Sequence, residues 1–106
     1  MKNITATQLK EQMDQGQEFE IIDVRESHEY EICHLASSRL IPMSKLMTSV
    51  DEIKGEKPVV MYCHHGNRSK AATAFLEKQR PEVAFLNLKG GIHAWAEEVD
   101  PNMPVY

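Results

Sequence analysis

The sequence predicts an α/β domain with a central, mostly parallel β-sheet flanked by short helices. Short apolar runs typical of strands alternate with segments of helical periodicity along the 106 residues, and this alternation favours a parallel sheet. Ile21 and Ile22 stand side by side in one apolar run, which indicates a strand covered on both faces. The length fits one domain of ordinary size, so we expect a single domain over residues 1–106.

The first half of the chain begins with a brief extended segment at Ile4 and Thr5. Thr5 and Gln8 have the spacing of a capping box, which predicts a helix over 6–14 that Gly16 stops. The remaining elements of this half are expected in the following order: a strand over 19–24, a short helix or turn over 25–31 that Ser27 can cap, an irregular segment over 32–36, an edge strand or buried bridge at 40–41, one helical turn over 42–47 and a polar connection over 49–57.

The second half of the chain is organised around an apolar run at 58–62, which we predict to be the central strand. An alanine-rich helix is expected over 70–79, and Arg80-Pro81 ends it because the residue before a proline disfavours the helical region. The apolar side chains that this helix turns to one side are Ala71, Ala72, Phe75 and Leu76. A strand over 83–88, a turn at Gly90-Gly91, a helix over 92–98 and an extended segment over 100–106 complete the prediction.

Composition and charge exclude several classes of function. The formal net charge is −4 and no cluster of lysine and arginine occurs, so we expect no nucleic-acid partner. No apolar stretch reaches the length of a membrane span, and the N-terminus lacks the apolar core of a signal peptide. Two cysteines are too few to cross-link a secreted scaffold. We therefore expect a cytoplasmic protein with free thiols and no membrane partner.

The loop that begins at Cys63 carries the strongest chemical signal. The thiol stands where the predicted strand 58–62 stops, and the N-terminus of the helix over 70–79 points back at it. Gly66 and Asn67 are the residue types that most readily take a positive φ, and a loop of this kind can turn backbone N–H groups inward as an anion cradle. Cradle and helix dipole would both stabilise a thiolate, which is the nucleophilic form of cysteine.

Several segments, in this order and spacing, make the chain similar to single-domain rhodaneses, members of the sulfurtransferase family. Any one of these segments is weak evidence for the family by itself, but the set is highly specific and covers nearly the whole chain. The matching segments are Asp23-Val24-Arg25-Glu26, Glu29-Tyr30, His34-Leu35-Ala36, Ile41-Pro42, the loop Cys63 to Ser69, and Gly90-Gly91-Ile92-His93-Ala94-Trp95. In one departure, Cys33 stands where members of the family usually have glycine.

The resemblance implies a rhodanese-like three-layer fold and a Cys63 that alternates between thiolate and persulfide, without a cofactor. Arg68 would bind the anionic part of the sulfur donor. The loop groups that would hold the persulfide belong to His64, His65, Gly66, Asn67, Arg68 and Ser69. Asp23 and Arg25 are expected to support the site, because they follow a neighbouring strand at the same rim of the sheet.

Each of these roles has a structural alternative. Arg68 can instead form an ion pair with a neighbouring carboxylate. Asp23 and Arg25 are expected to pair with each other or with loop groups rather than to touch substrate. For His64 and His65 we favour two exposed loop side chains that contribute only their backbones.

Two further hypotheses concern the histidines and the second thiol. Cys33, His34, Cys63, His64 and His65 raise the question of a metal site, but no C-x2-C or H-x3-H pair occurs among them, and adjacent histidines rarely bind one ion together. We therefore expect no metal. Cys33 could act as a resolving thiol that forms a disulfide with Cys63 or accepts its sulfur.

The predicted function is transfer of a sulfane sulfur from a donor such as thiosulfate to cyanide or a thiol, through a persulfide on Cys63. A cysteine-dependent phosphatase is one alternative, but such enzymes place five residues between cysteine and arginine, whereas four separate Cys63 from Arg68, and Tyr62 replaces their usual histidine. Arsenate reduction also uses a loop thiol and stays open. A non-catalytic binding module is disfavoured because such rhodanese-like domains typically lose the cysteine.

The expected partners are a small-molecule sulfur donor and a thiol or cyanide acceptor, with a sulfur-carrier protein as a further candidate. A chain of this length and composition is expected to be a monomer.

Overall fold

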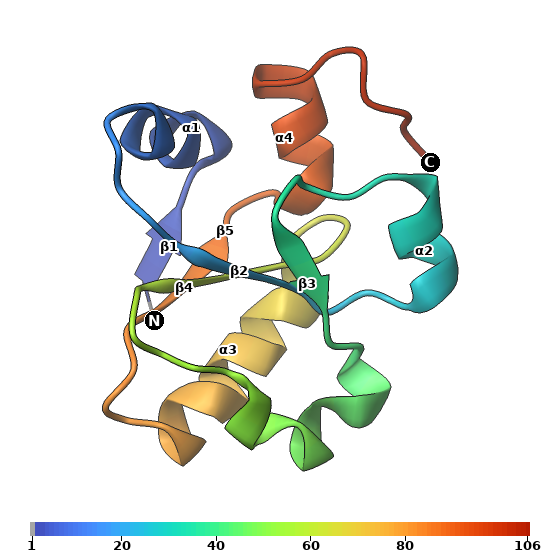
Figure 1. Cartoon of the computed structure of the whole chain (residues 1–106). Helices are drawn as coiled ribbons and strands as arrows, with labels where there is room; N and C mark the ends of the chain where they lie inside the picture. The colour runs from blue at the N-terminus through green and yellow to red at the C-terminus, as the bar shows by residue number, and fades with distance from the viewer. Residues whose placement is uncertain (1) are drawn as a thin grey trace.

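All strands of the sheet run parallel, in the order β1-β5-β4-β2-β3 (Figure 1). The computed structural model describes residues 2–106. Its strands are β1 (Lys2–Ile4), β2 (Glu20–Asp23), β3 (Ser38–Leu40), β4 (Val59–Tyr62) and β5 (Phe85–Leu88). The predicted α/β class is therefore confirmed, and β4 lies in the middle of the sheet as expected of the strand that leads into Cys63.

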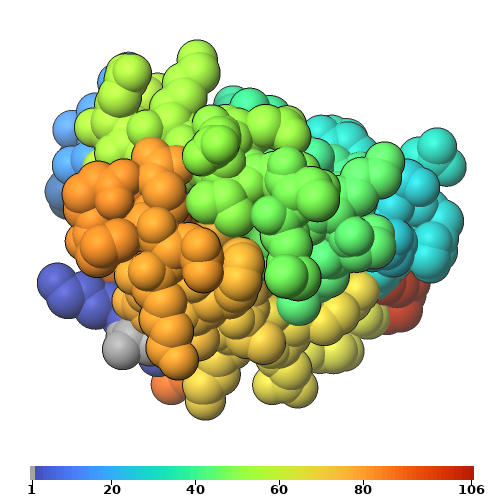
Figure 2. Space-filling model, turned by 90° about the horizontal axis from the view of Figure 1, so that it is seen from below, coloured from blue at the N-terminus to red at the C-terminus, as the bar shows by residue number. Residues whose placement is uncertain are grey.

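Helices cover both faces of the sheet and make the three layers. The α-helices are α1 (Ala6–Asp14), α2 (Ser27–Ile32), α3 (Asn67–Gln79) and α4 (Gly91–Glu98), and two 3₁₀ segments are η1 (Met43–Thr48) and η2 (Val50–Glu52). α1 and α4 lie together on one face, and α3 lies on the other (Figure 1). Seen from the α3 side, segment 43–57 lies beside α3 and closes that face of the molecule (Figure 2).

The central strand is buried on both sides. Val59 and Met61 belong to the core under α3, whereas Val60 and Tyr62 belong to the core under α1 and α4, and none of the four is exposed. Successive side chains of a strand point to opposite faces, so a strand covered by two layers of helices has to be apolar throughout. This burial fixes the position of Cys63, the residue that follows the strand.

Most predicted elements are confirmed, but several bounds differ: the edge strand expected at 40–41 is β3 at Ser38–Leu40, and the strand expected over 83–88 is β5 at Phe85–Leu88. Helix 6–14 has the predicted bounds, with both hydrogen bonds of the Thr5 capping box present. α3 begins at Asn67 rather than residue 70, because Gly66 takes a left-handed conformation and caps it. The cap of α2 is Glu26, not Ser27. Ala71 is exposed, so its predicted place on the buried side of α3 was wrong.

Within residues 2–106, every helix is too short or too polar to cross a membrane.

Candidate active site

The sulfur of Cys63 is buried at the carboxyl end of β4, where the residue is 1% exposed. The backbone N–H groups of Gly66 and Ser69 donate to Sγ at 3.1 and 3.3 Å. Both donors belong to the start of α3, so the partial positive charge of the helix N-terminus adds to theirs. These donors form the cradle of backbone N–H groups that the sequence predicted, and its stabilisation of a thiolate stays a prediction.

The loop keeps its shape because two glycines allow close approach. Gly66 has φ +102°, which brings its N–H round to the sulfur. Gly91, with φ +62°, packs against the loop backbone, and a Cβ there would lie 2.5 Å from the Cys63 carbonyl oxygen and 2.4 Å from that of His64. The N–H groups of Ile92 and His93 donate to these same two oxygens, at 2.9 and 3.0 Å. The first turn of α4 therefore fixes the backbone of the loop.

Ser69 is fully buried beside the thiol, and Asn87 of β5 orients it. The Ser69 hydroxyl lies 2.6 Å from Asn87 Oδ1 and 3.4 Å from Cys63 Sγ. Because a hydroxyl has one hydrogen, the shorter contact takes it, and the backbone donors remain as the groups that hold the sulfur. Sequence reasoning missed Asn87, although an asparagine inside an otherwise apolar strand is a visible signal of a buried polar contact.

Arg68 does not extend freely from the loop. Its guanidinium donates to both carboxylate oxygens of Glu29 on α2, at 2.7 and 2.8 Å. These hydrogen bonds lower the pKa of Glu29 to about 2 and raise the pKa of Arg68. The structure thus contains the ion pair that the sequence left as the alternative, and binding of the donor anion by Arg68 stays a prediction.

Asp23 and Arg25 form a buried ion pair beneath the rim of the sheet, with both side chains 0% exposed. Arg25 Nη2 donates to Asp23 Oδ2 at 2.7 Å and to the carbonyl oxygen of Cys33 at 2.6 Å. Burial by itself would lower the pKa of Arg25, but the contacts with Asp23 and Tyr106 raise it overall. These contacts match the expectation that the two residues pair with each other, and their support of the site remains a prediction.

The segment after α4 returns to the loop, so the extended tail expected over the surface reaches the site. Tyr106 stacks on the ring of His64, with centroids 3.9 Å apart. Its hydroxyl accepts a hydrogen bond from Arg25 Nη1 at 2.7 Å and donates to Glu29 Oε2 at 2.9 Å. Burial raises the pKa of Tyr106 to about 12, so the hydroxyl keeps its proton. No sequence signal pointed to this residue.

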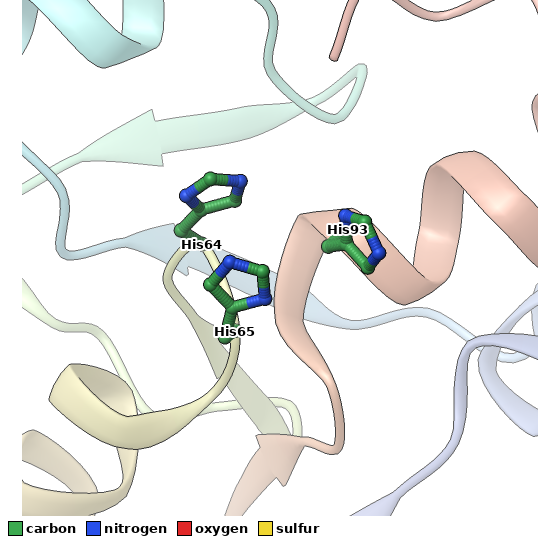
Figure 3. Close-up of side chains that lie close together, drawn as sticks. All are labelled: His64, His65 and His93. Atoms are coloured by element: carbon green, nitrogen blue, oxygen red, sulfur yellow. The ribbon is translucent and has the colours of Figure 1, made fainter. Parts of the chain in front are cut away.

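Three histidines gather beside the loop. His64 is half-buried and His65 is exposed, and His93 of α4 faces both (Figure 3). Burial and the neighbouring imidazoles lower the pKa of His64, against the attraction of Glu29. Asn67 is exposed at the first position of α3. The sequence grouped His34 and the two loop histidines with the cysteines and left out His93, which lies in a separate segment.

Cys33 lies apart from Cys63 in the packing of the core. It belongs to the cluster with Tyr62 and Trp95, whereas Cys63 belongs to the cluster with Met61 and α3. Its φ of −164° is extended backbone that any residue adopts, so the usual glycine is not required here. Both thiols are free, and the resolving role of Cys33 stays a hypothesis.

Known proteins match this chain over nearly its whole length. A family model described as "Rhodanese-like domain" matches residues 5–98. The "Probable adenylyltransferase/sulfurtransferase MoeZ" of Mycobacterium tuberculosis is 34% identical over 105 residues, which cover 97% of this chain and 26% of the relative. The "Adenylyltransferase and sulfurtransferase MOCS3" of Drosophila grimshawi is 32% identical and is matched over 81% of this chain and 21% of its own length. The chain thus spans about a quarter or less of these relatives.

Solved structures of similar size share the arrangement of helices and strands. The crystal structure of a rhodanese-related protein from Thermoplasma volcanium superposes with a TM-score of 0.84 at 32% identity, over 100% of this chain and 98% of the other. A rhodanese-like domain protein from Staphylococcus aureus gives 0.84 at 26% identity, over 100% and 99%.

Proposed function

This chain belongs to the rhodanese-like domain family, and from that premise we propose that it is a sulfurtransferase whose Cys63 carries the transferred sulfur. The match over residues 5–98 and the likeness to solved structures confirm the family resemblance and the rhodanese-like fold class. The observation that carries the proposal is the buried Cys63 sulfur at the end of β4, held by two backbone N–H groups. A sulfur held in this way is stabilised as an anion.

The first step is attack of the Cys63 thiolate on the sulfane sulfur of the donor. With thiosulfate as donor, a new S–S bond forms to Cys63, the old S–S bond breaks, and sulfite leaves with its electron pair. No general base is needed when the thiolate is already formed. Gly66 and Ser69 supply N–H groups to sulfur before the step, and further N–H groups of residues 64–69 are the candidates for holding the added sulfur.

The second step returns the thiolate. Cyanide or a thiolate attacks the outer sulfur of the persulfide, and the S–S bond breaks towards Cys63, which leaves as thiolate. The fixed loop backbone suits this cycle because it needs no rearrangement between the two displacements. The N–H groups of Ile92 and His93 hold that backbone from α4.

Sulfur transfer fits the loop better than phosphate hydrolysis does. Only four residues separate Cys63 from Arg68, so the loop is one residue short of the phosphatase pattern and makes a smaller cradle. The Arg68 guanidinium is also occupied by both oxygens of Glu29, rather than turned over the sulfur. These two features favour a single sulfur atom as the group that the loop holds.

The donor and acceptor follow from the chemistry of the persulfide. Thiosulfate is the donor we propose to test, cyanide and small thiols are candidate acceptors, and a sulfur-carrier protein is a further candidate partner. The two relatives described above carry adenylyltransferase and sulfurtransferase in one name, which makes a sulfur acceptor activated by adenylylation worth including. Free thiols suit a reducing compartment such as the cytoplasm.

The test is an intact-protein mass spectrum after brief exposure to thiosulfate. Wild type, Cys63→Ser and Cys33→Ser are compared, each with its thiols reduced beforehand. We expect the mass of one added sulfur on the wild type and on Cys33→Ser, none on Cys63→Ser, and loss of the added sulfur after cyanide. A wild type that gains no sulfur from thiosulfate or from a persulfide donor would contradict the proposal.

A further inference from the structure

We propose that His64, His65 and His93 bind a divalent transition-metal ion of the zinc class beside the Cys63 loop. Each of the three side chains offers one ring nitrogen, and these nitrogens all lie within 4.8 Å of one another. Two of the rings come from the loop and the third comes from the start of α4 (Figure 3). We call this set the histidine cluster. It is separate from sulfur transfer, which uses no metal.

The backbone holds the histidine cluster together before any ion arrives. The N–H of His93 donates to the carbonyl oxygen of His64 at 3.0 Å, and the N–H of Ile92 donates to that of Cys63 at 2.9 Å. The absence of a Cβ at Gly91 permits this close approach. The two elements that carry the three rings are therefore locked to each other, which reduces the ordering that an ion would have to impose.

Two side chains outside the histidine cluster orient its rings. Glu97 lies one helical turn after His93, and its Oε1 is 2.5 Å from His93 Nε2. A carboxylate bound to one imidazole nitrogen commonly supports a histidine that binds a metal through its other nitrogen, and for His93 that other nitrogen would be Nδ1. Tyr106 stacks on one face of His64, and the ring of His65 stacks on His64 with centroids 4.0 Å apart.

The dimensions fit a zinc ion after small side-chain rotations. Zinc binds imidazole nitrogen at about 2.0–2.1 Å, so two nitrogens on a tetrahedral ion lie about 3.3 Å apart. The observed nitrogens, within 4.8 Å, need to close by about 1.5 Å at most. Imidazole suits Zn²⁺, Cu²⁺ and Ni²⁺, and three such ligands leave a fourth position open for water or an anion.

The expectation from sequence that no metal binds rested on local spacing, which does not include His93, and the proposal departs from that expectation. His93 follows His65 by 28 positions in the sequence, so no short motif could connect them. The adjacency of His64 and His65 disfavours two ligands from one segment, but their ligand atoms nevertheless lie within the same 4.8 Å limit.

The test is a Zn²⁺ titration by calorimetry of the full chain without a polyhistidine tag. Because thiols also bind zinc, the comparison is made in the Cys33→Ser/Cys63→Ser background as well as in the wild type. We expect one ion per chain, with affinity at least tenfold weaker in His93→Gln. His28→Gln is the matched control, since His28 is an exposed histidine on α2 outside the cluster, and it should bind as the parent does.

A second measurement keeps the proposal falsifiable if a histidine variant folds poorly. In the wild type, Zn²⁺ should shift the ring-nitrogen NMR signals of His64, His65 and His93 and leave those of His28 unchanged. Glu97→Gln should weaken binding by about 10–100-fold, the usual effect of removing a carboxylate that supports a histidine ligand. Equal affinity in the parent and His93→Gln, or binding that disappears with the two thiols, would overturn the proposal.

Discussion

The guanidinium of Arg68 donates two hydrogen bonds to the carboxylate of Glu29, at 2.7 and 2.8 Å. The two residues are 39 positions apart, so this pair joins α2 to the start of α3. Glu29 is buried, whereas the Arg68 side chain is 40% exposed. The burial of this pair is intermediate between that of a buried and that of a surface ion pair, so we expect it to contribute an intermediate amount to stability.

Glu29→Gln should destabilise the protein by about 1–3 kcal/mol at pH 7, because Arg68 loses a charged acceptor. The pKa of Glu29 is about 2 in the fold, below its ordinary value of 4.5. The wild type therefore has this stability in full above pH 4.5 and loses it as the pH falls towards 2. Urea denaturation of both proteins at several pH values checks this. Asp14→Asn, in a surface pair with Lys10, is the control and should cost under about 1 kcal/mol. A gap between wild type and Glu29→Gln that stays constant down to pH 2 would contradict the prediction.

Arg25→Met should cost about 3–5 kcal/mol, because it leaves Asp23 buried and charged without its partner. The double variant Asp23→Leu/Arg25→Met should recover much of that loss, since apolar side chains can replace a buried ion pair. A double-mutant cycle by urea denaturation measures the coupling. Additive losses in the double variant would refute the view that the unpaired charge is the main cost.

Gly91→Ala should be among the most damaging single substitutions in the chain. Its Cβ would lie within 2.6 Å of three backbone atoms of Cys63 and His64, at a left-handed φ. We expect a loss of about 3 kcal/mol or more and slower persulfide formation, because the loop has to move. Gly16→Ala isolates the effect of the left-handed φ, since a Cβ there meets nothing within 4 Å, and it should cost about 1–2 kcal/mol. Similar losses in the two variants would show that the contact with the loop is unimportant.

Ser69→Ala should separate stability from reactivity. The variant keeps the backbone N–H groups that contact the sulfur, so the rate of sulfur loading on Cys63 should change by less than about threefold. Stability should fall by about 1–2 kcal/mol, because the buried Oδ1 of Asn87 loses its donor. Mass spectrometry of samples quenched at successive times gives the rate of sulfur loading, and urea denaturation gives the free energy of unfolding. A rate lowered a hundredfold would mean that the hydroxyl itself holds the sulfur.

The fold was largely predictable because its signals are local. The capping box at Thr5, the apolar run of β4 and the break at Arg80-Pro81 each act within one element, and all three are observed. The start of α3 was not predictable, because it depends on how Gly66 packs against Gly90 and Gly91 from another segment.

Of the site, the central loop and the pairing of Asp23 with Arg25 were predictable from the sequence. Cys63 follows from a strand–loop–helix pattern, but its surroundings come from distant parts of the chain. Asn87 contacts Ser69 across 18 positions, and Tyr106 contacts Glu29 across 77. Such pairings depend on the three-dimensional arrangement of the strands, and the local patterns of a single sequence do not show which distant residues come into contact.

The outer edge of the sheet has a consequence for biosynthesis. β1 is the first element of the described chain and pairs with β5, the last strand, and Asn87 of β5 reaches Asn3 of β1 across 84 positions. A chain emerging from the ribosome can pair β2 with β3 and β4, but β4 keeps one open edge until β5 has been made. The strand that presents the thiol therefore acquires its second neighbour only after residues 85–88 have been made, and β1 has to wait unpaired until then.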